Sequence, residues 1–94
     1  MKYKIYLGLN DKDLKKQIIS TDEAYDKVYQ VIGDNSIQEI TGFYQGIREK
    51  TLIIEKFEET GFDIKKACKE LTKVFNQECV IYETLASNGE FVYA

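Results

Sequence analysis

Two kinds of hydrophobic repeat alternate along this sequence, and their order limits the folds open to the chain more than any other feature. Where every second residue is apolar, the pattern is typical of a β-strand with one face on a core. Where apolar residues recur every three or four positions, it is typical of an amphipathic helix. The first segment is of the strand type, and its apolar face comprises Tyr3, Ile5, Leu7 and Leu9. The clearest helical stripe comprises Ile64, Ala67, Cys68, Leu71, Val74 and Phe75.

Capping residues predict where two helices begin and end. Ser20 followed by Glu23 is a capping-box pattern, and Gly33 supplies the left-handed residue at which a helix commonly ends. Asp63 is placed to cap the second helix, and Asn76 suits its C-terminal end. Along the sequence, the two predicted helices therefore flank a central segment that comprises residues 34–62.

That central region and the C-terminus predict further strands. Residues 37–44 and 51–57 read as two strands, and the short Gly-containing connection 45–50 favours an antiparallel hairpin. Residues 79–85 predict a fourth strand, and Asn88-Gly89 predicts a turn that folds residues 91–93 back on it. The order βαββαβ with an added strand predicts one α+β domain over residues 1–94. We expect a ferredoxin-like antiparallel sheet with two helices on one face and a C-terminal hairpin strand.

The charge balance limits the class of partner. The net charge is −3, from 13 Lys+Arg and 16 Asp+Glu, which argues against a duplex nucleic acid, since such partners normally require a basic excess. Single-stranded RNA stays open through Tyr6 beside Lys4, although residues 51–57 lack a glycine and have one aromatic residue. No apolar run approaches the roughly 18 residues of a membrane span. We therefore expect a cytoplasmic protein without a membrane partner.

Several catalytic groups are missing from the sequence. It contains no histidine, which removes the usual general base at neutral pH and the usual imidazole ligand. Cys68 and Cys79 are too few for a zinc site and read as free, buried thiols. Asp11 and Asp13 lack the further oxygen ligands of a calcium loop. We expect no metal, no other cofactor and no enzymatic activity, although catalysis by a lysine, a tyrosine or a carboxylate pair stays open.

Two polar loops are expected to meet at one edge of the sheet. The end of the first strand meets the start of the fourth, because the two strands run antiparallel. We predict a binding rim made of Asn10, Asp11, Lys12, Asp13, Asn76, Gln77 and Glu78. The alternative is a pair of solvated loops that hold each other by side-chain hydrogen bonds.

The connection 45–50 is the second candidate site, and we expect it at the opposite end of the sheet. It carries Lys50 and Arg48, the only arginine in the sequence. The planar arginine side chain suits a phosphate or a carboxylate better than a lysine does. Lys12, with the backbone amides around Asn10, is an alternative source of positive charge for an anion.

The sheet face away from the helices is the third candidate. Tyr6, Tyr44, Phe57 and Tyr82 are expected to point outward there. An aromatic face that no helix covers is commonly an interface. We therefore predict a homodimer that associates through this face.

Four segments carry a resemblance to known proteins: Gly8-Leu9-Asn10-Asp11-Lys12-Asp13, Gly42-Phe43-Tyr44, Thr51-Leu52-Ile53-Ile54-Glu55 and Asn76-Gln77-Glu78. They resemble small uncharacterised ferredoxin-like proteins of phages and other mobile elements, over most of the chain. The resemblance implies a non-enzymatic phage accessory protein in the host cytoplasm that inhibits a bacterial immune system by binding. Its partner would be a host defence protein, as for anti-CRISPR proteins, or a sequestered signalling nucleotide. The alternative is a small regulatory ligand-binding or homodimeric module of cellular metabolism.

Overall fold

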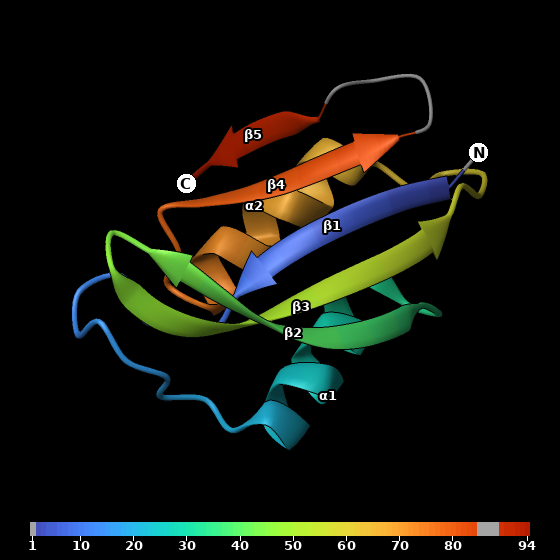
Figure 1. Cartoon of the computed structure of the whole chain (residues 1–94). Coiled ribbons are helices and arrows are strands. Elements are labelled where there is room, and N and C mark those ends of the chain that lie inside the picture. The colour runs from blue at the N-terminus through green and yellow to red at the C-terminus, as the bar shows by residue number, and fades with distance from the viewer. Residues whose placement is uncertain (1, 85–88) are drawn as a thin grey trace.

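The computed structural model describes residues 2–84 and 89–94 of the chain. Two helices and five strands follow one another in the order βαββαββ (Figure 1). They are β1 (Lys2–Gly8), α1 (Thr21–Ile32), β2 (Ser36–Tyr44), β3 (Ile47–Phe57), α2 (Ile64–Val74), β4 (Cys79–Thr84) and β5 (Glu90–Tyr93). The predicted α+β class is confirmed.

Side-chain caps begin both helices, as the sequence predicts. The Ser20 hydroxyl accepts a hydrogen bond from the backbone N–H of Glu23 at 3.2 Å, and Gly33 ends α1 with a φ of 80°. The Asp63 carboxylate accepts from the N–H of Lys66, also at 3.2 Å. Each cap satisfies a backbone donor that has no partner within the helix. Asn76 takes a left-handed φ of 48° just after α2.

The sheet is antiparallel throughout, in the order β2-β3-β1-β4-β5. The β2–β3 hairpin is longer than expected, because its turn consists only of Gln45 and Gly46, with φ values of 52° and 78°. Two successive residues of positive φ match the right-handed twist of the flanking strands. The predicted return of β5 onto β4 is confirmed by their pairing. Asn88 of the predicted turn lies outside the described residues.

The core lies between the sheet and the two helices. The predicted face of β1 is buried there: Ile5 and Leu7 are fully inaccessible, and Leu9 is 3% exposed. Tyr82 also belongs to this core, so its prediction as an outward-facing residue is wrong. It is 6% exposed, its hydroxyl donates to Glu90 at 2.6 Å, and burial raises its pKa to about 12.

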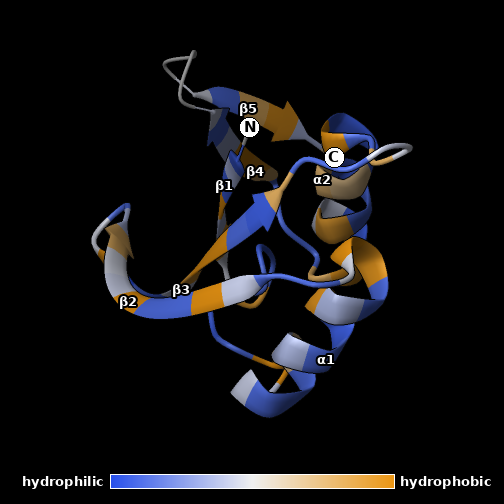
Figure 2. Ribbon diagram, turned by 90° about the vertical axis from the view of Figure 1, so that its right-hand side faces the viewer, coloured by the Kyte–Doolittle hydropathy of each residue, from blue (hydrophilic) through white to orange (hydrophobic). Residues whose placement is uncertain are grey.

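One face of the sheet carries no helix, and we call it the open face. Figure 2 shows both helices on the other side, and β2 and β3 bending away from them toward the open side. Strand alternation assigns to this face the side chains between the buried ones, among them Tyr6, Glu49 and Ile81. The sheet is therefore concave on its open face. Within the described residues, neither helix is long and apolar enough to cross a bilayer.

Candidate functional site

A cavity of about 230 Å³ lies on the open face at the end of β1. The β2–β3 hairpin forms one wall, and β4 with β5 forms the other. Its aromatic lining comes from Tyr6, Tyr44 and Phe91. Its charged lining comes from Asp11, Lys12, Lys15, Glu49 and Glu78. Aromatic walls with a few charged groups are typical of a small-molecule site.

Glu49 is the half-buried carboxylate of this cavity. Its Oε2 accepts a hydrogen bond from the backbone N–H of Asn10 at 2.9 Å. No lysine or arginine of the described chain forms an ion pair with it, whereas Glu39, Glu55, Glu59 and Glu90 are each paired. A partly desolvated carboxylate without a cation is costly unless something compensates its charge. This arrangement suits a positively charged ligand.

The predicted rim forms beside the cavity. The Asn76 side-chain amide donates to Asp11 at 2.8 Å and to Asp13 at 2.9 Å. Gln77 donates to the carbonyl of Asn10. The bond from Asn76, followed by the one from the Leu14 N–H, lowers the pKa of Asp11 below its ordinary value. The structure thus brings the two loops together, and their role in binding remains a prediction.

The rim residues contribute unequally to the cavity. Asn10, Asp11, Lys12, Gln77 and Glu78 line it, as Tyr44 does. Asp13 and Asn76 do not line it. The hydrogen bonds from the Asn76 side chain to Asp11 and Asp13 instead hold the loop after β1 against the turn after α2.

The position predicted for Arg48 and Lys50 is wrong. They lie at the same end of the sheet as the rim, because β3 runs antiparallel to β1 and its start meets the end of β1. The N–H of Leu9 donates to the carbonyl of Lys50 at 3.0 Å, and the Asn10 side chain donates to the carbonyl of Arg48 at 3.2 Å. Neither side chain lines the cavity.

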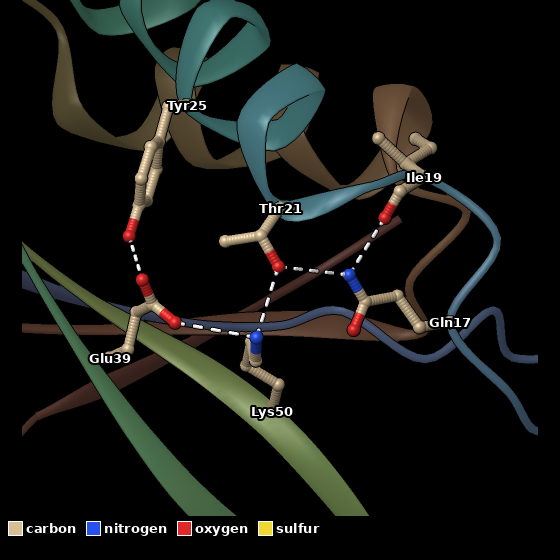
Figure 3. A network of polar contacts seen from close by, with 6 residues as sticks. All are labelled: Gln17, Ile19, Thr21, Tyr25, Glu39 and Lys50. Atoms are coloured by element: carbon tan, nitrogen blue, oxygen red, sulfur yellow. Dashed lines mark hydrogen bonds and ion pairs between the residues drawn. The ribbon is translucent and has the colours of Figure 1, made fainter.

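The side chain of Lys50 belongs to a polar network on the helix side of the hairpin (Figure 3). Its ammonium donates to the Thr21 hydroxyl at 3.1 Å and pairs with Glu39 at 3.4 Å. Glu39 also accepts from the Tyr25 hydroxyl, and this bond raises the pKa of Tyr25. Gln17 joins the network through Thr21 at 3.3 Å. The network fastens the hairpin to the start of α1.

The outward aromatic residues are only partly as predicted. Tyr6 is half-buried on the open face, and its hydroxyl donates to Glu83 at 2.8 Å. Burial, followed by this hydrogen bond, raises the pKa of Tyr6. Phe57 is 74% exposed at the far end of β3. Tyr82 is in the core, and the predicted homodimer remains a prediction.

Sequence reasoning missed several cavity residues, chiefly Gly8, Ile47, Glu49 and Phe91. The sequence predicts residues 45–50 as a connection, whereas in the structure β3 begins at Ile47 and its alternation includes Glu49. Extending it from Leu52 and pairing β3 antiparallel with β1 would have placed Glu49 beside Asn10.

The chain is thus a small α+β protein whose curled antiparallel sheet has a charged, aromatic-lined cavity on its open face. No known protein family matches the sequence, and neither does any curated protein. Among solved structures, a phage SAM lyase in its apo state is similar, with a TM-score of 0.74 and 20% sequence identity. The match covers 99% of this chain and 88% of that one. At this identity the likeness shows a shared fold.

This comparison overturns the prediction that the chain is not an enzyme, because an enzyme shares the fold over nearly the whole of this chain. The prediction rested on the absence of histidine and of clustered cysteines. It neglected substrates that already carry a good leaving group, for which no acid or metal is needed. A phage protein with this fold is consistent with the expected phage anti-defence role, whereas anti-CRISPR activity and nucleotide sequestration remain predictions.

Proposed function

We propose that the protein is a phage-encoded lyase acting on S-adenosylmethionine (SAM), and that the open-face cavity is its substrate site. The observation that carries the proposal is the half-buried carboxylate of Glu49, which has no ion-pair partner in the described part of the chain. It lines a cavity together with the aromatic residues Tyr6, Tyr44 and Phe91. SAM carries a sulfonium and an ammonium on its methionine end, and both a carboxylate and aromatic faces attract such cations.

The size of the cavity favours a particular pose. About 230 Å³ is below the roughly 300–1,000 Å³ of sites that enclose a whole drug-sized ligand. We place the methionine end beside Glu49, with its carboxylate toward Lys12 or Lys15. The adenosine end then lies across the exposed rings of Tyr44 and Phe91, which are each 58% exposed.

The chemistry of a sulfonium explains why this chain needs no histidine. When the bond between sulfur and the amino-acid side chain breaks, its electron pair returns to sulfur, and a neutral thioether leaves. The attacking group can be the carboxylate of the substrate itself, which closes a lactone without any proton transfer. Elimination is the second route, in which a base removes a proton from the neighbouring carbon and an alkene forms. The protein's main task in the first route is to hold a productive conformation.

Sequestration of a signalling nucleotide is less well supported. Arg48 does not line the cavity, and Lys50 is engaged by Glu39 and Thr21. The backbone amides near the rim are also occupied: that of Asn10 by Glu49, and that of Lys12 by the carbonyl of Asn76. Only Lys12 and Lys15 remain at the cavity, a charge better suited to one carboxylate than to several phosphates.

Two finer assignments belong to this proposal. The strand order β2-β3-β1-β4 supports a ferredoxin-like arrangement, extended at one edge by β5. In a host cytoplasm, removal of SAM would deprive methyltransferases of their methyl donor, which fits the anti-defence role that the sequence resemblance implies.

The test is to incubate the purified chain with SAM and to identify the products by mass spectrometry. We expect a thioether nucleoside together with a lactone or an unsaturated amino acid, which separates the two routes. S-adenosylhomocysteine, which lacks the sulfonium charge, should bind more weakly in calorimetry. If SAM is neither cleaved nor bound while a cyclic oligonucleotide binds at micromolar concentration, the lyase proposal fails and sequestration takes its place.

A further inference from the structure

Gly8, the last residue of β1, lies directly beneath the carboxylate of Glu49. A Cβ built on Gly8 would lie 2.5 Å from Oε1, 2.6 Å from Cδ and 2.7 Å from Oε2 of Glu49. All three distances are far below van der Waals contact, which begins at about 3.4–4 Å. The space that a side chain at position 8 would fill is thus occupied by the carboxylate of the cavity.

The backbone itself does not require glycine at this position. Gly8 ends β1 and pairs with Thr51, and it is absent from the residues of positive φ, which include Gly33, Gly46 and Gly89. Glycine in a strand costs roughly 0.5–1 kcal/mol relative to alanine. Close approach of another group is a recognised reason for such a glycine. Here that group is Glu49.

The close approach brings the carboxylate to a fixed donor. Oε2 of Glu49 meets the N–H of Asn10 at 2.9 Å. Asn10 is itself held, because its side chain donates to the carbonyl of Arg48 and its own carbonyl accepts from Gln77. Oε1 of Glu49 has no hydrogen-bond partner among the residues that the structure describes. One oxygen is therefore anchored and the other is free for a ligand.

We propose that Gly8 is a positioning residue that sets the Glu49 carboxylate against the Asn10 N–H and so presents it to the cationic end of the substrate. The inference rests on the proposed function and extends it. A methyl group at position 8 must push the carboxylate away from Asn10. Aspartate at position 49 shortens the side chain by one methylene, so its carboxylate avoids that methyl group and still faces Asn10 from the neighbouring strand.

The kinetic test compares Gly8→Ala, Glu49→Asp and the double variant, with Gly42→Ala as the matched control. Gly42 is also a strand glycine without positive φ. Its Cβ would meet the Thr51 hydroxyl at 3.3 Å and the backbone carbonyl oxygen of Glu49 at 3.9 Å, which is ordinary contact, and would not meet the Glu49 carboxylate. We expect Gly8→Ala to raise the KM for SAM about tenfold or more with little change in kcat, and Gly42→Ala to leave both nearly unchanged. Glu49→Asp should raise KM in the wild-type background and lower it in the Gly8→Ala background. A purely structural role for Gly8 would not reverse the sign of this second change.

A measurement on the wild-type protein separates this inference from the proposed function. The amide resonance of Asn10 should follow the titration of Glu49 in NMR spectra, with Glu49→Gln to assign the effect. In Gly8→Ala that response should disappear. If the Asn10 amide ignores Glu49 in the wild type, or if Gly8→Ala keeps both the response and the KM, the inference is wrong. If SAM is not a substrate, the NMR result still shows whether Gly8 holds the Glu49 carboxylate against the Asn10 N–H.

Discussion

Among single residues, Glu49 is a half-buried carboxylate of the cavity that forms no ion pair in the described chain. Glu39, Glu55, Glu59 and Glu90 are each paired with a lysine, whereas Glu49 has only a backbone N–H. A carboxylate anchored through one oxygen and without a cation is a good electrostatic partner for a cation. Its expected role is therefore to bind the substrate, and not to transfer a proton.

Replacing Glu49 by glutamine should mainly weaken binding. The substitution keeps the shape of the side chain and removes its charge. A charge-assisted contact contributes roughly 1.5–3 kcal/mol, so the KM for SAM should rise by about 10- to 150-fold. The ammonium of the substrate keeps its charge throughout the reaction, so kcat should change little if Glu49 binds that group. Initial rates at varied SAM concentration measure both constants.

Glu70→Gln is the matched control, since Glu70 is exposed on α2, which lies on the helix side of the sheet. An unchanged KM in Glu49→Gln, or an equal loss in Glu70→Gln, would contradict the assignment of Glu49 to the substrate.

Among the elements, the loop after β1 depends on the turn after α2. Asp11 accepts from the N–H groups of Asp13 and Leu14, each at 3.0 Å, and from the Asn76 side chain. The loop supplies Lys12 and Lys15 to the cavity. Because Asp11 is only half-buried and the neighbouring residues 12–16 are exposed, these bonds shape the loop more than they stabilise the domain.

This loop should respond to acid. The pKa of Asp11 is lower in the folded chain than its ordinary value of 3.8, so the unfolded chain takes up protons first as the pH falls. The contribution of Asp11 to stability is therefore complete above pH 3.8 and is lost progressively below it. Asn76→Gly removes the main donor and keeps a residue that tolerates the φ of 48°. The thermal midpoint of this variant should fall less steeply below pH 4 than that of the wild type. Parallel slopes would show that Asn76 does not act on Asp11.

The elements that sequence predicts correctly are those with local signals. Ser20 and Asp63 mark helix starts because a cap is a contact within one turn of the chain. The predicted connection of residues 45–50 is too long. The charged residues Arg48, Glu49 and Lys50 hide the start of β3, and the turn itself consists only of Gln45 and Gly46. Strand β4 has apolar residues on both faces, so its pattern could not reveal that Tyr82 faces the helices. The cavity depends on pairings between distant strands, and these are not encoded in any one segment.

For the molecule as a whole, the open face is the surface through which a homodimer is predicted to form. It carries Tyr44, Ile47, Phe57, Phe91 and Tyr93, each of which is at least 41% exposed. Several exposed apolar side chains on a sheet face that no helix covers are typical of an interface. The homodimer predicted from sequence would cover part of it.

Phe57→Glu tests this prediction without touching the core. Phe57 is 74% exposed, so the substitution should leave the fold intact and weaken association. Phe43→Glu is the matched control, because Phe43 is 73% exposed and belongs to the alternate set of hairpin residues. Sedimentation at micromolar concentration should find a dimer or larger species for the wild type and for Phe43→Glu. A wild-type monomer would contradict the prediction, as would equal loss of association in both variants.

The two-residue turn between β2 and β3 has a consequence for how the chain folds. Its register runs unbroken from Tyr44–Ile47 to Ser36–Glu55, so the hairpin closes on itself with almost no loop to order. Hairpins of this kind form within about 1–10 μs. The pairings of β1 with β3 and with β4 join residues far apart in the chain and must form more slowly. Because the cavity lies where these late pairings meet, we expect it to be the last part of the domain to appear on folding and the first to vanish on heating.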